Sequence, residues 1–155
     1  MDMMAKAKVF MSMRPHMRRL VLESFIYLAW ARILKAMPFA RVAPSLGKQL
    51  EETTYARDKT NERLLHQVSR AVHLASRHTW WESKCLVMAI AAMKMLERRR
   101  IGSTLYLGTA KDAVTGRMVA HAWLRSGVLY LTGADEMSKY TVVATFGKTI
   151  PHKEN

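Results

Sequence analysis

The sequence predicts an α+β fold, in which helices come first and a small antiparallel sheet follows. Apolar residues recur at helical spacing through residues 17–99, whereas residues 103–146 are rich in β-forming residues. Half of the 155 residues are apolar, which is enough for one domain with a hydrophobic core. Helices followed by strands are the order expected of an α+β domain.

The N-terminal part of the chain is predicted to be helical and basic. Residues 1–16 are rich in Met and Lys, and we expect a loose arm or a short helix there. Residues 17–37 predict a helix that Pro38 ends. This helix either packs on the core or offers a docking surface to a partner or a membrane. Its apolar positions are Leu20, Phe25, Leu28 and Ile33.

A second helical stretch follows. Residues 38–44 are expected to be a connection, and Ser45 is expected to cap the next helix. The polar run from Glu51 to Glu62 fits either a solvated helix face or a flexible linker. A helix that faces the core then ends near Ser76. Its apolar residues at helical spacing are Leu64, Leu65, Val68, Ala71, Val72 and Ala75.

A further helix is predicted over residues 82–99, with the only cysteine of the chain, Cys85, in its first turn. Glu82 or Ser83 can satisfy free backbone amides at the start of this helix. Residues 98–100 are three arginines at its end, where positive charge interacts favourably with the helix dipole. We prefer this explanation of the arginine run to a nucleic-acid patch.

Strands are predicted in the C-terminal third. Residues 117–125 alternate, so that His121 and Trp123 share one face of the strand. Ser126-Gly127 is expected to be a tight two-residue connection to a return strand, which makes a hairpin. The other expected segments are strands at 103–109, 128–132 and 140–146, a turn at 111–116 and a frayed end at 148–155.

Charge and cysteine content limit the classes of function. A net charge of +13 and a pI near 10.3 indicate an anionic partner: nucleic acid, a membrane surface, or an acidic peptide or protein. A single cysteine excludes an internal disulfide and favours a reducing compartment. The sequence holds no P-loop, no dinucleotide-binding glycine motif and no zinc-type Cys and His cluster.

The N-terminus also has some features of a signal peptide. Three arginines precede the apolar run from Leu20 to Trp30, which ends in a small-x-small sequence. Glu23 interrupts that run, however, and Arg32 and Lys35 continue an amphipathic pattern beyond it. We therefore expect a cytoplasmic protein. The run is also too short and too charged to span a membrane.

Cys85 is the first candidate for chemistry. The free N–H groups and the dipole at a helix start favour a thiolate, and Lys84 adds a positive charge nearby. The alternative is that Cys85 is a small buried side chain, which is the commoner state of a lone cysteine.

His121 adds weight to the catalytic alternative. A titratable ring within an apolar strand is either a satisfied core histidine or a general base that faces a nucleophile. Asp135 follows the return strand of the hairpin and could accept a hydrogen bond from the second ring nitrogen. Asp112 and Glu136 are the competing carboxylates.

The order of these residues resembles that of the transglutaminase-like cysteine proteases, which have a cysteine at a helix start, a histidine as His-x-Trp and an aspartate on the following strand. A fuller set resembles the stand-alone leader peptidase of lasso-peptide biosynthesis, the microcin-processing type, over about residues 64–146. Many members carry Arg where this chain has Met88. The matching segments are Cys85-Leu86, residues 89–92, Met95-Leu96, the arginine run, Ile101-Gly102, residues 106–108, residues 120–124, Thr132-Gly133 and Tyr140-Thr141.

This resemblance implies a transglutaminase- or papain-like core in residues 64–155, with the nucleophile helix packed on the sheet, and a basic docking region in residues 1–63. It implies a bacterial cysteine endopeptidase that cuts a precursor peptide between its leader and core segments. A small leader-recognition protein would present the leader, and an ATP-dependent macrolactam cyclase would use the freed core. No metal or cofactor and no nucleic acid are expected, and weak membrane association is compatible with the basic charge.

The catalytic residues implied by the resemblance are Cys85, His121 and Asp135. The Cys85 backbone N–H and a backbone or indole N–H of Trp80 or Trp81 are candidates to stabilise an oxyanion. Trp80, Trp81 and Trp123 otherwise wall the site or fill the core. Two other functions stay open: acyl transfer to an amine, and a non-enzymatic basic module that binds nucleic acid or a membrane.

Overall fold

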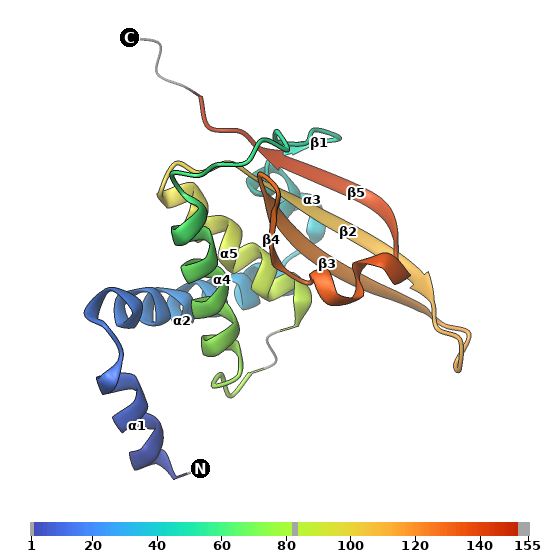
Figure 1. The fold of residues 1–155 in the computed structure, drawn as a ribbon. Coiled ribbons are helices and arrows are strands. Elements are labelled where there is room, and N and C mark those ends of the chain that lie inside the picture. Colours follow the sequence, from blue (N-terminus) through green and yellow to red (C-terminus); the bar gives the residue numbers. More distant parts are fainter. Residues whose placement is uncertain (1, 82–83, 152–155) are drawn as a thin grey trace.

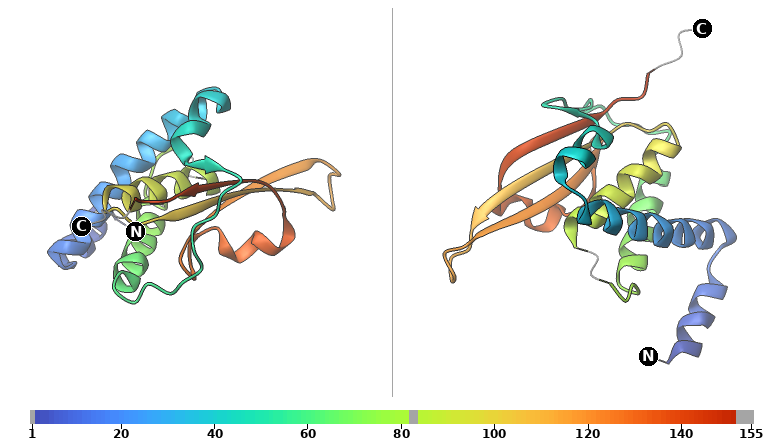
Figure 2. Two further views of the ribbon diagram at one scale, coloured as in Figure 1. Left: turned by 90° about the horizontal axis from the view of Figure 1, so that it is seen from above. Right: turned by 180° about the vertical axis from the view of Figure 1, so that it is seen from behind.

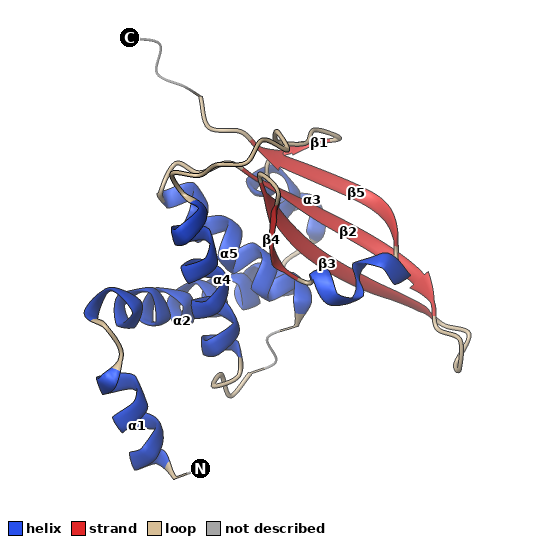
Figure 3. Ribbon diagram, in the orientation of Figure 1, coloured by secondary structure: helices blue, strands red, loops and turns tan. Residues whose placement is uncertain are grey.

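A computed structural model of the protein describes residues 2–81 and 84–151. Helices occupy most of the first 98 residues and a sheet follows, which confirms the predicted α+β order (Figures 1 and 3). The helices are α1 (Met3–Ser12), α2 (Pro15–Ala36), α3 (Phe39–Leu46), α4 (Glu62–Ser76) and α5 (Cys85–Arg98).

The hydrophobic core forms where α2, α4 and α5 pack on one another and on the sheet. Helix α5 is apolar on nearly every side, because small alanines alternate with larger apolar residues, and it therefore lies at the centre. Helix α4 contributes the predicted apolar stripe, of which Leu65, Val68 and Val72 are buried. Thus α2 shares one buried cluster with the helix that carries Cys85.

Helix α1 extends away from this core, as Figures 1 and 2 show. It has no buried residue. Of the two expected forms of the N-terminal segment, a loose arm or a short helix, the structure shows the helix. Helix α2 begins at Pro15, whose missing amide proton costs nothing in a first turn. None of the helices within the described residues combines the length and the hydrophobicity needed to cross a membrane.

The segment after Pro38 differs from the prediction. Residues 38–44 were expected to be a connection, but helix α3 occupies most of them, because Val42 and Leu46 can be buried one turn apart on the core. The expected N-cap, Ser45, lies in the last turn of α3, where its hydroxyl donates to the Val42 carbonyl at 2.7 Å. Ile33, an expected core-facing position of α2, is 58% exposed.

The sheet has five antiparallel strands in the order β1-β5-β2-β3-β4. A 3₁₀-helix, η1 (Ala134–Lys139), joins β4 to β5. The sequence did not reveal η1 or the two-residue β1, since neither has a periodic pattern of its own. The strands are β1 (Lys48–Gln49), β2 (Ser103–Lys111), β3 (Met118–Ser126), β4 (Leu129–Thr132) and β5 (Thr141–Lys148).

The predicted hairpin forms between β3 and β4, with its loop one residue later than expected. Ser126 pairs with Leu129, so Gly127 and Val128 make the turn. Gly127 has a φ of 55°, which favours glycine there. A side chain at this position would also meet the Ala56 carbonyl oxygen at 2.6 Å.

The two faces of the sheet have different environments. Leu105, Ala122 and Leu124 join the hydrophobic core beneath the helices. Because side chains alternate along a strand, Tyr106, His121, Trp123 and Arg125 point to the opposite face. Residues 51–58, which we call the strap, run across this second face. His121 therefore lies among aromatic and polar neighbours instead of in the apolar core.

Candidate active site

Cys85 is the first residue of α5, which confirms the expected position of the cysteine in a first helical turn. The helix begins three residues later than predicted, and the expected caps Glu82 and Ser83 lie outside the described residues. The Met88 amide donates to the Lys84 carbonyl at 3.0 Å, the first bond of the helix. The amides before it are directed toward the helix start, beside a half-buried free thiol.

The His121 ring on β3 is held by a hydrogen bond. Its Nε2 lies 2.8 Å from the carbonyl oxygen of Gly133, in the turn between β4 and η1. A carbonyl oxygen can only accept, so Nε2 must donate and carry the ring proton. In the neutral ring, Nδ1 then has the lone pair that a general base needs.

Aromatic rings also hold the imidazole. The His121 ring stacks on Tyr140, with centroids 4.9 Å apart, and on Trp123, with centroids 5.8 Å apart. Trp123 in turn stacks on Tyr106 at 5.7 Å, with an angle of 14° between the rings. The histidine is thus one member of an ordered row of rings from β2, from β3 and from Tyr140, the residue before β5.

Helix α5 and strand β3 pack directly against each other, so the elements that carry the predicted nucleophile and base are neighbours. Strand β4 pairs with β3 only from Leu124 to Ser126. Beside His121, the edge of β3 therefore has no paired strand on the β4 side, and the turn at Gly133 lies there instead. Within residues 2–81 and 84–151, no hydrogen bond joins the Cys85 thiol to the His121 ring. The catalytic pairing of Cys85 with His121 therefore stays a prediction.

A family model described as the transglutaminase-like superfamily matches residues 27–145, about three-quarters of the chain. The chain belongs to this superfamily. The match begins inside α2 and includes Cys85, His121 and Asp135. Members of the superfamily are usually cysteine proteases or acyltransferases. No curated protein and no solved structure shows significant similarity to the chain.

Asp135, the third residue of the predicted transglutaminase-like trio, lies in the first turn of η1 and is exposed. No hydrogen bond joins its carboxylate to His121 among the described residues, and Nε2 already has Gly133 as its acceptor. The role of Asp135 stays a prediction. The sequence did not reveal the Gly133 carbonyl as the partner of His121, because every residue has a backbone carbonyl and no residue type marks the one that accepts the hydrogen bond.

The competing carboxylates are engaged elsewhere. Asp112 caps the β2–β3 turn, and its Oδ1 accepts from the Thr115 amide at 2.6 Å and from the Val114 amide at 3.0 Å. The hydrogen bonds from Thr115 lower the pKa of Asp112. Glu136 pairs with Lys139 at 3.2 Å on the surface. Neither carboxylate is bonded to the His121 ring in the described part of the chain.

The three tryptophans that the sequence proposed for the site have different positions. Trp80 is 93% exposed, so its side chain does not fill the core. Trp81 packs against the core, but its indole Nε1 is buried and has no partner among the described residues. Trp123 is buried between Tyr106 and His121. An unpaired buried donor costs about 1–3 kcal/mol, so the Trp81 indole is a candidate for a role in binding an oxyanion.

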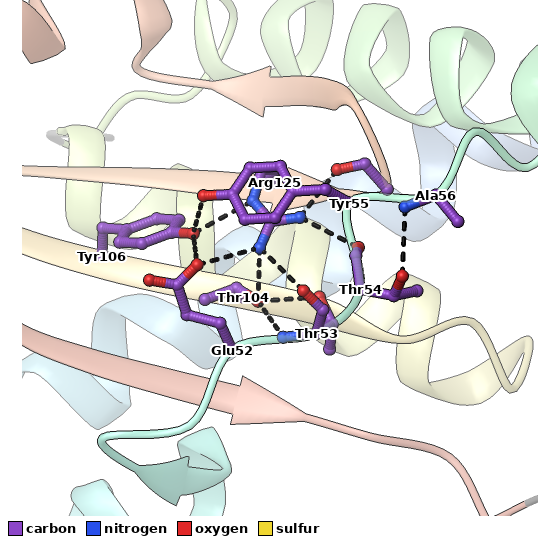
Figure 4. Close-up of polar contacts among 9 residues, drawn as sticks. Glu52, Thr53, Thr54, Tyr55, Ala56, Thr104, Tyr106 and Arg125 are labelled. Carbon is purple, nitrogen blue, oxygen red and sulfur yellow. Dashed lines mark hydrogen bonds and ion pairs between the residues drawn. The ribbon is translucent and has the colours of Figure 1, made fainter.

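Arg125 fixes the strap over the face that carries His121, and sequence reasoning did not identify it. Its side chain is fully buried and lies over the Tyr55 ring, 3.5 Å from the centroid. The guanidinium donates to the Thr53, Thr54 and Gly127 carbonyls and, through Nε, to the Tyr106 hydroxyl at 3.0 Å (Figure 4). One arginine thereby joins the strap, the hairpin turn and the row of rings that includes His121.

The residues described by the structure contain no group of three or more His, Cys, Asp or Glu that could hold a metal ion. Met88 is half-buried and packs against the core.

Proposed function

We propose that this protein is a cysteine endopeptidase that removes the leader from a lasso-peptide precursor. The observation that carries the proposal is the His121 ring, whose Nε2 is held by the Gly133 carbonyl so that Nδ1 is left as the base. The ring lies on the strand that packs against α5, the helix that begins with the only cysteine. Membership of the transglutaminase-like superfamily supports thiol-based acyl chemistry.

In the proposed reaction, His121 Nδ1 takes the proton from the Cys85 thiol, and the thiolate attacks the scissile carbonyl carbon. The new C–S bond places negative charge on the carbonyl oxygen. The Cys85 backbone N–H and the Trp81 indole N–H are the proposed donors to that oxygen. His121 then protonates the leaving amine as the C–N bond breaks.

Water completes the cycle by attacking the thioester. His121 takes a proton from that water, the C–S bond breaks, and the thiol of Cys85 is restored. The leader is released as a carboxylic acid, and the core segment keeps the free N-terminus that a macrolactam cyclase would consume. If an amine replaced the water, the same residues would perform acyl transfer.

The proposed docking surface for a leader-recognition protein is an apolar row on the outer side of α2. We call this row the α2 stripe: Leu22, Ile26, Trp30, Ile33 and Met37, which are 40–68% exposed. The spacing of four, four and three residues places the first four along one face of α2, and Met37 is the residue that caps the end of this helix. Exposed Arg19, Arg32 and Lys35 flank the row, which favours an acidic rim on the partner.

The test is a cleavage assay with a precursor peptide and a small recognition protein from the same gene neighbourhood, where the proposal expects both to be encoded. We expect two products whose masses add up to that of the precursor plus one water, and no product with Cys85→Ala or His121→Ala. A product that carries an added amine would instead identify acyl transfer. Intact precursor with the wild-type protein and its partner would contradict the proposal.

Circular dichroism of Cys85→Ala separates loss of chemistry from loss of fold. Because the thiol is half-buried at the start of a helix, this variant should unfold at nearly the wild-type denaturant concentration. A non-enzymatic module would not cleave the precursor. It would bind nucleic acid or vesicles in a salt-sensitive manner, and this binding would be unchanged in Cys85→Ala.

A further inference from the structure

Two glycines surround the imidazole of His121 and leave space for it. Gly133 has a φ of 72°, in the left-handed region that favours glycine. A Cβ there would overlap the Ala122 carbonyl oxygen and would lie 2.9 Å from the Trp123 Cβ and 3.1 Å from His121 Nε2. The absence of this side chain lets the Gly133 carbonyl come within hydrogen-bond distance of the ring.

Gly108 has the same effect from the neighbouring strand. It is paired with His121 across β2 and β3. A Cβ on Gly108 would lie 2.9 Å from the Trp123 ring and 2.9 Å from the Tyr140 Cβ. These are the two rings on which the imidazole stacks, so Gly108 makes room for the groups that fix the plane of His121.

We propose that the backbone carbonyl of Gly133, instead of the carboxylate of Asp135, orients His121 and fixes its tautomer. This proposal rests on the proposed function, because it assigns the third member of that catalytic group. Gly133 acts through His121 and is a positioning residue. Asp135 is exposed on η1 and has no hydrogen bond to the ring in the described chain.

A neutral acceptor has a different effect from a charged one. A hydrogen bond to an ionised partner is roughly twice as strong as one between neutral groups. The carbonyl therefore holds the ring in one orientation but stabilises the imidazolium less than an aspartate would. In a serine protease triad, replacing the orienting aspartate by asparagine lowers kcat about 10⁴-fold. Asp135→Asn should show no loss of that size in this protein.

Nitrogen NMR of ¹⁵N-histidine-labelled protein tests the tautomer without any substrate. The His121 signals are assigned by their loss in His121→Gln. We expect the Nε2–H tautomer for neutral His121, and the same tautomer in Asp135→Asn and in the matched surface control Glu136→Gln. An Nδ1–H tautomer in the wild type, or a changed tautomer in Asp135→Asn alone, would overturn the proposal.

Alkylation of Cys85 provides a second readout, because it is the only cysteine. The rate with iodoacetamide between pH 5 and pH 9 should be the same within about twofold in wild type and Asp135→Asn. It should fall about tenfold near pH 6 in Gly133→Ala, where the ring loses its acceptor. Gly116→Ala is the matched control, since Gly116 has a φ of 68° and its Cβ would meet only Lys111 Cε, at 3.9 Å.

These outcomes separate the two proposals. Where the wild type cuts the precursor, unchanged alkylation in Gly133→Ala contradicts the role of the carbonyl. A tenfold change in Asp135→Asn contradicts it whether or not the precursor is cut. If Gly133→Ala does not fold, the Asp135→Asn alkylation and the wild-type tautomer still decide the question. Failure of the cleavage assay with the expected tautomer intact would count against the proposed function alone.

Discussion

The carboxylate of Glu23 on α2 binds the guanidinium of Arg99, which follows the end of α5, through two hydrogen bonds of 2.7 and 2.6 Å. Arg98 approaches the same carboxylate at 3.5 Å. The arginine run thus joins α2 to the end of α5, in addition to its position at a helix C-terminus. It also gives Glu23, which interrupts an apolar run in the sequence, a structural role.

We expect Glu23→Gln to lower the free energy of unfolding by about 1.5–3 kcal/mol, because charge-assisted hydrogen bonds at a partly buried site are lost. Urea titration followed by circular dichroism measures this change. Arg98→Gln is the control, because that side chain is 66% exposed and should contribute less than about 1 kcal/mol. Equal effects of the two substitutions would show that the two-bond geometry is unimportant.

Arg125→Met should destabilise the protein by about 3–5 kcal/mol, because it leaves three backbone carbonyls of the strap and hairpin turn without their donor. Arg125→Lys should recover only a small part of the lost stability, since one ammonium group cannot reproduce the planar set of donors of a guanidinium. Chemical denaturation measures both variants. Limited proteolysis of Arg125→Met should cut first within the strap, residues 51–58. If these residues are as resistant to proteolysis as in the wild type, Arg125 does not hold the strap in place.

The hydroxyl of Tyr106 should make the free energy of unfolding depend on pH in the alkaline range. Burial raises the pKa of this hydroxyl, so the folded protein keeps this proton at a pH where the unfolded chain loses it. The stabilisation is complete below about pH 10, the usual value for tyrosine, and is lost as the pH rises above it. Urea midpoints from pH 8 to pH 11 should therefore fall less steeply in Tyr106→Phe than in wild type.

Gly108→Ala should cost about 1–3 kcal/mol, because the added methyl group would press on the Trp123 ring and the Tyr140 Cβ. The displaced rings should also turn the imidazole and lower the cleavage rate at least tenfold. Thermal unfolding and the peptide assay measure the two effects. If the variant loses stability but retains full activity, the rings do not position His121.

Trp81→Phe separates catalysis from stability. Removing an unpaired buried N–H should leave the free energy of unfolding unchanged or raise it by up to about 1 kcal/mol. If that N–H binds the oxyanion, kcat should fall about 10²–10³-fold with little change in KM. Trp80→Phe, on a ring that is 93% exposed, is the comparison. A wild-type kcat for Trp81→Phe would leave the oxyanion to backbone donors.

Ile26→Asp tests the α2 stripe. A charge at this 68% exposed position should weaken binding of the recognition protein at least tenfold, because the charge must be desolvated at an apolar contact. Alkylation of Cys85 should be unchanged. Val114→Asp, on a residue that is 94% exposed in the β2–β3 turn, controls for added surface charge. Calorimetry measures the affinity, and equal binding by both variants would place the contact elsewhere.

The periodic elements could be predicted because their signals are local. The stripe of α4 and the alternation of β3 follow from residue spacing, and each formed where expected. Segments that depend on distant partners were harder to predict. Helix α3 has Pro38 before it and Pro44 inside it, which favoured a connection, and the burial of Val42 and Leu46 on the core outweighs that signal. The 3₁₀-helix η1 follows a left-handed Gly133 and has no buried residue, so no apolar pattern marks it in the sequence.

The sequence by itself determined the α+β order, the cysteine at a helix start and the histidine on a strand, because periodicity and residue type specify these features. Only the tertiary structure decided what holds the histidine. Its partners are a backbone carbonyl twelve residues away, the ring of Trp123 on the same strand and the ring of Tyr140, which follows η1. Every residue carries a carbonyl, so only the folding of the chain selects the one at Gly133, where the missing side chain permits close approach.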